Sequence, residues 1–526
     1  MSQKLQESIT MEDILQKILT ANVYDVAIET PLDKAKKLSK RFENSIWFKR
    51  EDLQPVFSFK LRGAYNRMSR LTKKERDTGV IASSAGNHAQ GVALSASYLN
   101  CRAVIVMPIT TPPVKIASVR SFNAEVILHG DTYDEAYQEA IRLSKEQKLV
   151  FIHPFDDAEV IAGQGTIGVE IVRQIESPPF AIYIAVGGGG LIGGIATYIK
   201  NLWPQVKIIG VEPEDACAMT QSLKAKKRIQ LNEIGLFADG VAVKQVGEIT
   251  FDLASKYVDR MITVKTDEIC AAMKDFYEDT RSILEPAGAL AIAGLKLDIC
   301  KNNIHNENLI AVTCGANMNF ERLRFVAERS VIGEEKEAMI AVEIPEKAGS
   351  LKFLCKVIGN RNLTEFSYRM SNKDSADIFI GVEVENKNDR LLFIDKIRNS
   401  GFKCIDLTDD EFSKMHLRYM VGGRLPETNN ISTNSYKELL YRFEFPERPG
   451  ALMRFLEAMR PNWSISIFHY RNHGADIGRI IVGVLVQKND FHNWEKFLKD
   501  IGYKNWQETT NPAYKLFLGA NIENSG

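Results

Sequence analysis

Between residues 78 and about 315, hydrophobic runs alternate with segments of helical length. Six short runs rich in β-branched residues predict buried strands: 79–83, 101–107, 124–130, 181–186, 206–212 and 309–314. Helical segments such as 132–148 separate several of them. Because continuous apolar strands that alternate with helices form parallel sheets covered on both faces, we expect an α/β body here.

The pattern changes after about residue 330, where a strand is followed by a Pro/Gly turn, a helix and two strands. The same order then recurs: VEIPEKAGSL at 342–351 matches FEFPERPGAL at 443–452, and FSYR at 366–369 matches FHYR at 468–471. The offset moves from 443 − 342 = 101 to 468 − 366 = 102, so one residue was inserted or lost between the blocks. Agreement at so many ordered points predicts a duplicated βαββ-type module.

These changes of pattern divide the chain into three expected domains, 1–330, 338–411 and 438–511. The segment 422–435 has the composition of a linker between the two copies of the module. The segment 325–338 is interpreted as a linker-like transition between the body and the first copy.

Composition excludes several classes of protein. The 526 residues are 45% hydrophobic and 25% charged, and 67 basic side chains balance 67 acidic ones, so no charge excess indicates nucleic acid or an anionic membrane as partner. Seven widely spaced cysteines without a C-x-x-C pair argue against a disulfide framework and against a zinc site. No signal-peptide pattern and no run of about 18 apolar residues is present, so we expect a cytoplasmic protein without a metal site.

A glycine-rich turn follows the predicted strand 181–186. Glycines at the end of a strand and the start of a helix let backbone N–H groups converge on an anion. The residues Gly188, Gly190 and Gly193 also satisfy G-x-G-x-x-G, and Glu212 follows about 20 residues later, where a Rossmann fold has its ribose-binding acid. A nucleotide-dependent oxidoreductase is therefore one hypothesis, and a tight turn without a ligand is another.

The segment ASSAGNHAQG (82–91) also joins a predicted strand to a helix. Its small hydroxyl residues, Gly86 and Asn87 could present N–H groups and an amide to a small anionic ligand. The alternative is an ordinary helix capped by Ser83 or Ser84. A single histidine without an acidic or cysteine partner nearby is weak evidence for catalysis, so His88 is more readily structural.

Two further residues have unusual positions. Lys60 lies between Phe59 and Leu61 in SFKLRGA, where its stem could simply pack on apolar surface while the amine reaches water. Cys314 lies at the tip of the turn in VTCGANMNF, where most free cysteines are buried structural thiols.

The four features together favour one cofactor. A nicotinamide enzyme has no use for the lysine of SFK. A pyridoxal phosphate enzyme needs a lysine for a Schiff base, a glycine turn for the phosphate, and partners for the ring oxygen and the pyridine nitrogen. Lys60, the turn from Gly187 to Leu191, Asn87 and Cys314 supply these four parts.

Six motifs, SFKLRGA, SSAGNHAQG, VGGGGL, FADGVAV, EPAGA and CGANMNF, together resemble the fold-type II pyridoxal phosphate enzymes of the serine/threonine dehydratase group. The duplicated module narrows this resemblance to the long, biosynthetic threonine dehydratases, over nearly the whole chain from 30–32 to 511–518. The resemblance implies a tryptophan synthase β-like α/β body of two parallel-sheet subdomains, followed by two α+β ACT-like modules. It implies β-elimination of L-threonine to 2-oxobutanoate and ammonia, the first committed step of isoleucine biosynthesis, with the preference between threonine and serine left open.

The resemblance also implies roles for individual residues. Lys60 would carry the cofactor and act as general base, Asn87 would bind the ring 3′-oxygen, and Cys314 would face the pyridine nitrogen, where such threonine dehydratases commonly have serine. The phosphate would be held by Gly187, Gly188, Gly189, Gly190 and Leu191. The substrate would be held by Ser83, Ser84, Ala85, Gly86 and His88.

The ACT-like repeat implies regulation. In similar enzymes isoleucine inhibits through this region and valine opposes it, and the assembly is a homotetramer. The candidate effector residues are the repeat-equivalent Tyr368 and Tyr470, with Arg361 and Phe366 close by in sequence. Two alternatives are a purely structural repeat and a non-catalytic amino-acid sensor with a degenerate body.

Overall fold

The computed structural model divides the chain into two compact units, Met1–Gly333 and Glu334–Gly526. It describes residues 11–347, 349–369, 375–410, 413–414, 436–446, 451–460, 462–471 and 477–511. The predicted linker 422–435 lies outside the described residues.

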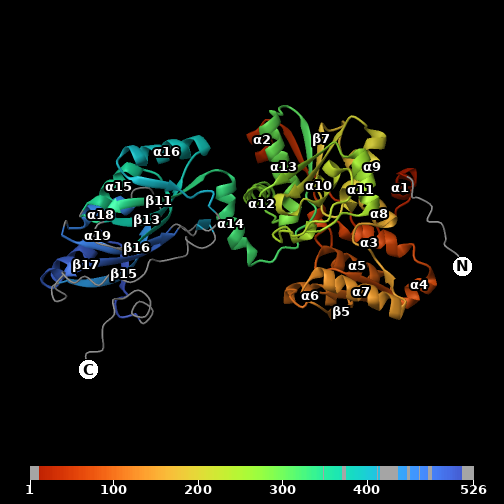
Figure 1. Ribbon diagram of the computed structural model, residues 1–526, viewed down its shortest axis with the longest axis horizontal. Helices are drawn as coiled ribbons and strands as arrows, with labels where there is room; N and C mark the ends of the chain where they lie inside the picture. The colour runs from red at the N-terminus through yellow and green to blue at the C-terminus, as the bar shows by residue number, and fades with distance from the viewer. Residues whose placement is uncertain are drawn as a thin grey trace, which may run out of the picture. The chain divides into compact units, whose positions relative to one another are not determined.

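The first unit contains a six-stranded sheet in the order β1-β2-β10-β7-β8-β9 (Figure 1). Its strands are β1 (Leu32–Lys34), β2 (Ser45–Lys49), β7 (Ala181–Ala185), β8 (Lys207–Pro213), β9 (Arg260–Val264) and β10 (Asn308–Val312). All neighbouring pairs are parallel except β1 with β2. The central strand β7 is buried at all five positions, as expected for a sheet covered on both faces.

A second, smaller sheet in this unit has four parallel strands in the order β5-β4-β3-β6. Its strands are β3 (Val80–Ser83), β4 (Ala103–Met107), β5 (Glu125–Leu128) and β6 (Val150–Phe151). The six strands predicted from hydrophobic runs are all present in these two sheets, which confirms the α/β body of two parallel-sheet subdomains.

Helices cover both sheets. They are α1 (Met11–Leu19), α2 (Lys36–Phe42), α3 (Lys60–Ser69), α4 (Lys73–Thr78), α5 (Asn87–Tyr98), α6 (Pro113–Arg120), α7 (Tyr133–Gln147), α8 (Ala158–Gln174), α9 (Gly190–Leu202), α10 (Ala218–Ala225), α11 (Glu248–Tyr257), α12 (Thr266–Thr280), α13 (Pro286–Asn302) and α14 (Arg322–Gly333). Helices α3 and α8 cross in backbone contact, because a Cβ on Gly63 would lie 2.6 Å from the carbonyl oxygen of Val160. This crossing holds the start of α3 against the subdomain that contains the six-stranded sheet.

The segment 325–338 differs from the expected linker. Helix α14 runs through it to Gly333, and the strand β11 begins at Glu337. Within α14, Arg329 is 5% exposed and its Nη1 lies 2.8 Å from Oδ1 of Asp267 on α12. The segment therefore contains the boundary between the two units, but it consists largely of a helix of the first unit and the start of a strand of the second.

The second unit is one eight-stranded antiparallel sheet in the order β14-β11-β13-β12-β16-β17-β15-β18. Its strands are β11 (Glu337–Pro345), β12 (Leu363–Arg369), β13 (Ser375–Glu383), β14 (Lys403–Asp406), β15 (Tyr436–Pro446), β16 (Ser464–Arg471), β17 (Ile477–Gln487) and β18 (Lys504–Gln507). The helices α15 (Ser350–Ile358), α16 (Lys387–Asn399), α18 (Ala451–Ala458) and α19 (Phe491–Ile501) share its hydrophobic core (Figure 1).

The strand order shows the internal duplication. Each half contributes β-α-β-β-α-β, and the two halves meet where β12 pairs with β16. In this pairing Phe366 lies opposite Tyr470 and Tyr368 lies opposite Phe468. Since Tyr368 and Tyr470 are equivalent in the repeat, the two modules are related by an approximate two-fold axis between these strands.

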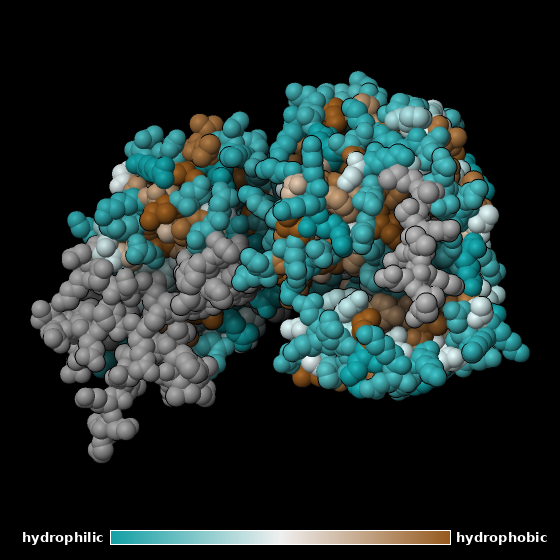
Figure 2. Space-filling model, turned by 45° about the vertical axis from the view of Figure 1, so that its right-hand side comes forward, coloured by the Kyte–Doolittle hydropathy of each residue, from teal (hydrophilic) through white to brown (hydrophobic). Residues whose placement is uncertain are grey.

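On the face shown in Figure 2, hydrophilic residues dominate the surface of the first unit and hydrophobic ones are scattered among them. Within the part of the chain that the structure describes, no helix is long and apolar enough to cross a membrane.

Candidate active site

Lys60 is the first residue of α3, and its surroundings are unusual for a lysine. Its Nζ donates a hydrogen bond to the carbonyl oxygen of Pro154 at 2.9 Å. Within the described ranges no carboxylate lies within ion-pair distance of this amine. The side chain is half-buried, and the loss of hydration around the amine lowers the pKa of Lys60 to about 8, although Cys314 and Glu285 oppose the shift. A substantial unprotonated fraction near neutral pH is what a nucleophile and general base needs.

The glycine turn forms a close-fitting cradle at the start of α9. A Cβ on Gly188 would lie 2.2 Å from the Phe155 ring, and one on Gly187 would lie 2.8 Å from the backbone of Val241. Gly189 has φ +96°, a left-handed conformation that favours glycine. The first N–H groups of a helix have no intrahelical acceptor, so this turn can present them to an anion such as a phosphate.

The predicted parts meet through short connections. Pro154, whose carbonyl accepts from Lys60, is followed by Phe155, whose ring packs on Gly188. At the end of β10, the N–H of Phe59 donates to the carbonyl oxygen of Cys314 at 3.3 Å. The lysine, the glycine turn and the cysteine turn are therefore neighbours in one site.

Asn87 is fixed at the start of α5 by two partners that sequence reasoning did not assign. Its Nδ2 donates to Oε1 of Glu285 at 2.5 Å, and its Oδ1 accepts from Nδ2 of Asn317 at 2.6 Å. The amide keeps one N–H for a ligand. Burial, followed by the charge of Asp239, raises the pKa of Glu285 to about 7. The only signal for both partners was their presence in the motifs EPAGA and CGANMNF.

Cys314 is 3% exposed, and its Sγ donates to the carbonyl oxygen of Ala287 at 3.4 Å. Burial, followed by the charge of Glu285, raises the pKa of the Cys314 thiol. The side chain therefore stays a neutral thiol, so it cannot hold a proton on a pyridine nitrogen by charge as an aspartate would.

The loop between β3 and α5 is half-buried at three of the predicted substrate residues and buried at Ser83 and His88. Ser84, Ala85 and Gly86 are half-buried, and a Cβ on Gly86 would meet no atom within 4 Å, so the loop borders open space. His88 is buried, with its Nε2 2.9 Å from the carbonyl oxygen of Ile152. Burial, followed by the charge of Lys60, lowers the pKa of His88 to about 3, so the ring is neutral and engaged in packing.

Two buried hydroxyls border the site. Within the described chain, Ser83 Oγ at the end of β3 and Ser58 Oγ, two residues before Lys60, have no hydrogen-bond partner. Unpartnered buried polar atoms are rare in folded proteins and fit a site that a polar ligand completes. Together with the glycine cradle and the weakly basic lysine, they fit pyridoxal phosphate.

The position of Glu212 argues against the hypothesis of a nucleotide-dependent oxidoreductase. Glu212 is fully buried, and its carboxylate accepts from the backbone N–H groups of Met219 and Thr220, each at 2.8 Å. It therefore caps α10 and is not available to a ribose. Within the described part of the chain, no group of three or more His, Cys, Asp or Glu side chains could hold a metal ion.

The four predicted effector residues belong to the second unit. The hydroxyl of Tyr368 donates to Oε1 of Glu346 at 2.8 Å. Arg361 forms two contacts of 2.7 Å with Asp389. Phe366 is fully buried against Phe468, with ring centroids 5.4 Å apart, and Tyr470 is 7% exposed. Tyr368 and Tyr470 lie on adjacent strands, whereas Arg361 and Phe366 are engaged in packing.

The chain matches models of two protein domains. Residues 23–315 match the pyridoxal-phosphate dependent enzymes, and 328–417 and 430–518 each match the C-terminal regulatory domain of threonine dehydratase. These ranges cover the catalytic body and both copies of the duplicated module.

Similar proteins agree with these matches. The chain is 54% identical over 509 residues to the biosynthetic L-threonine dehydratase IlvA of Burkholderia multivorans, covering 96% of this chain and 99% of the relative. It is 46% identical to that of Escherichia coli, covering 98% and 99%. The solved threonine deaminase isoform 2 of Solanum lycopersicum, in its processed form, is 52% identical with a TM-score of 0.60, covering 62% of this chain and 94% of that one. With the lysine, cradle and tandem modules all in place, the chain belongs to the pyridoxal-phosphate dependent enzymes, as a member of their biosynthetic threonine dehydratase family.

Proposed function

We propose that this protein converts L-threonine to 2-oxobutanoate and ammonia at the site around Lys60, by loss of the β-hydroxyl as water and hydrolysis of the resulting enamine. The observation that carries the proposal is the Lys60 amine, which has a lowered pKa, a backbone carbonyl as partner and a glycine cradle beside it. Pyridoxal phosphate, when bound, supplies an electron-withdrawing ring that makes the α-proton of the amino acid removable.

Each residue then has a defined task. Lys60 would hold the cofactor covalently, and its free amine would accept the α-proton of the substrate. The turn Gly187–Leu191 binds the phosphate, and Asn87, held by Glu285 and Asn317, directs its remaining N–H to the ring oxygen. The neutral Cys314 at the ring nitrogen leaves the ring a weaker electron acceptor, which favours prompt loss of the β-hydroxyl.

In this proposal the loop Ser83–Gly86 binds the substrate carboxylate. It joins β3 to α5, it borders open space at Gly86, and the first turn of α5 directs its N–H groups toward the loop. In this proposal the neutral, buried ring of His88 supports the loop through its contact with Ile152.

Isoleucine is the proposed inhibitor and valine its opponent, both bound in the second unit. The support is the duplicated regulatory module and the placement of Tyr368 and Tyr470 on adjacent strands across the approximate two-fold axis. A homotetramer in the cytoplasm is proposed on the resemblance to similar enzymes, and all seven cysteines are free, as in a reducing compartment.

The test is a steady-state assay of 2-oxobutanoate from threonine, and pyruvate from serine, with and without isoleucine. We expect turnover of threonine that isoleucine suppresses. Tyr368→Phe, which removes the donor to Glu346, should weaken this suppression and leave the absorption of the bound cofactor unchanged. Absence of threonine turnover in colourless, folded protein would contradict the proposal.

A further inference from the structure

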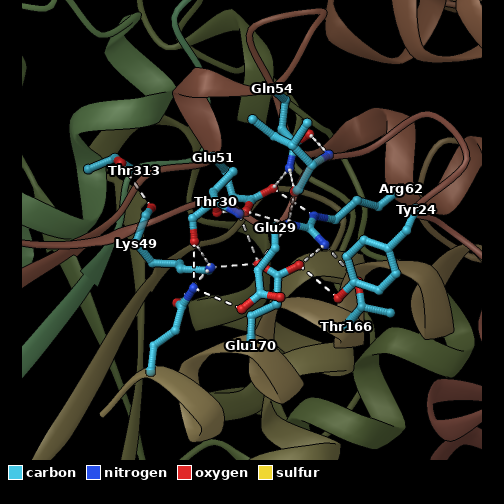
Figure 3. A network of polar contacts seen from close by, with 12 residues as sticks. Tyr24, Glu29, Thr30, Lys49, Glu51, Gln54, Arg62, Thr166, Glu170 and Thr313 are labelled. Atoms are coloured by element: carbon cyan, nitrogen blue, oxygen red, sulfur yellow. Dashed lines mark hydrogen bonds and ion pairs between the residues drawn. The ribbon is translucent and has the colours of Figure 1, made fainter.

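Four charged side chains without solvent exposure lie beneath the first turn of α3. Lys49, Glu51, Arg62 and Glu170 are each 0% exposed, and we call them the charge quartet. Arg62 Nε lies 2.8 Å from Glu51 and its Nη1 lies 2.6 Å from Glu170, while Lys49 Nζ lies 2.6 Å from Glu170. Figure 3 shows Arg62 between the two carboxylates. Two positive and two negative charges leave the quartet neutral.

Such a buried cluster of charges is an inefficient way to stabilise a fold. Removing charges from water costs several kcal/mol per ion, and apolar residues of similar volume often stabilise a core as well or better. Burial opposes ionisation of Glu51, yet Arg62 and Lys49 hold its pKa below the ordinary value, so this carboxylate stays ionised. What fixed, fully hydrogen-bonded ions do supply is one defined geometry.

The fixed position of Arg62 also constrains the position of Lys60. Arg62 follows Lys60 by two residues in the first turn of α3, and its guanidinium is held by both oxygens of Glu51 and both oxygens of Glu170. Glu170 belongs to α8, which crosses α3 in backbone contact. A turn fixed by four charged contacts cannot rotate about the helix axis without breaking them.

Lys49 of the charge quartet also contacts the turn that contains Cys314. The backbone carbonyl of Lys49 accepts from the N–H of Thr313 at 3.0 Å and from its hydroxyl at 2.9 Å. The Thr313 hydroxyl also lies 2.9 Å from Oδ1 of Asp52. Thr313 directly precedes Cys314, whose carbonyl accepts from Phe59. The lysine turn and the cysteine turn are therefore tied to one rigid set of contacts.

We propose that the charge quartet positions the Lys60 amine for attachment of the cofactor and for proton transfer, so that Arg62 and Glu170 are positioning residues of the enzyme. This inference rests on the role proposed for Lys60 above. Because misplacement of a reacting group by about 1 Å can cost on the order of 100-fold in rate, a small rotation of α3 should suffice to slow the reaction.

The experiment compares full-length Glu170→Gln with Asp275→Asn. Asp275 is a matched control, since it is 3% exposed and lies between Arg41 and Lys296, outside the site. Both variants should lower Tm, because Glu170→Gln leaves the buried Arg62 and Lys49 with one carboxylate fewer, and Asp275→Asn removes the buried carboxylate shared by Arg41 and Lys296. Only Glu170→Gln should lower kcat on the order of 10- to 100-fold with KM for threonine little changed, and slow the attachment of pyridoxal phosphate to Lys60 measured by borohydride trapping and peptide mass.

A charge-balanced variant covers the case in which the single variant fails to fold. Arg62→Met with Glu170→Gln leaves one buried cation, Lys49, and one buried carboxylate, Glu51, whose charges still attract each other, so Tm should recover while kcat and trapping stay low. Recovery of kcat with Tm, or equal loss in Asp275→Asn and Glu170→Gln, would overturn the positioning role. If the parent protein traps the cofactor on another lysine, it is the assignment of Lys60 that fails.

Discussion

At the scale of single residues, the site depends on partners that are far away in the sequence. The motifs singled out Lys60, Asn87 and Cys314 as candidates, because each carries a chemical group in an unusual setting. Glu285 was not predicted, since it lies 198 residues from the Asn87 it holds. The charge quartet was likewise missed, because its ion pairs join β2, α3 and α8, and only the fold brings these elements together.

Glu285→Gln tests the electrostatics of the site. The amide oxygen of Gln can still accept from Asn87, but the negative charge that raises the pKa of Lys60 is lost. Since only the unprotonated amine attacks an aldehyde, the rate of cofactor attachment rises with pH through the pKa of Lys60, near 8 in the parent. The midpoint should move to lower pH in the variant, as measured by trapping from pH 6 to 10. A midpoint that stays in place or rises contradicts this placement of Glu285.

At the scale of elements, the six strands predicted from hydrophobic runs are present in the first unit, whereas helix α14 occupies much of the segment 325–338 that was expected to be a linker. Its polar composition resembles a linker, yet Arg329 is buried beside Asp267 and helix α14 continues to Gly333. A buried ion pair makes a charged segment part of a core, and composition alone carries no information about such a pair. The glycine turn was predictable because its conformation at Gly189 and its close approach at Gly188 both require glycine.

Gly188→Ala tests whether the glycine turn at the start of α9 holds the cofactor. The added Cβ would lie 2.2 Å from the Phe155 ring, so the turn must shift, and overpacking of this kind typically costs about 1–3 kcal/mol. We expect affinity for pyridoxal phosphate to fall by about tenfold in a titration of cofactor-free protein. The control is Gly168→Ala on α8, where the Cβ would make an ordinary contact of 3.4 Å with Tyr198. Equal affinity in both variants would show that the turn does not hold the cofactor.

At the scale of the whole molecule, the chain divides after Gly333 into a catalytic unit and a regulatory unit. A solved relative supports independent folding of the first, because the threonine deaminase of Solanum lycopersicum covers 62% of this chain and 94% of its own. A chain that ends near Arg329 would cut α14 and remove its last residues, up to Gly333. The division therefore belongs after Gly333.

Truncation after Gly333 should keep threonine turnover and abolish inhibition by isoleucine. Isoleucine has no β-hydroxyl to lose, and we expect it to inhibit from a separate site in the second unit, where coupling of about 1–3 kcal/mol would change threonine affinity roughly 5- to 150-fold. The measurement is turnover against isoleucine concentration for both lengths of chain. A soluble, active truncated enzyme that isoleucine still inhibits at the same concentration would show that the second unit is structural.

The most direct test of the account is to locate the cofactor on the full-length protein. Purified enzyme is treated with borohydride, digested, and the lysine that carries the pyridoxyl group is identified by peptide mass, with Lys60→Ala measured alongside. The account predicts that the group is on Lys60 alone, and that folded Lys60→Ala lacks both the label and threonine turnover. A label on a different lysine, or substantial turnover in folded Lys60→Ala, would contradict it.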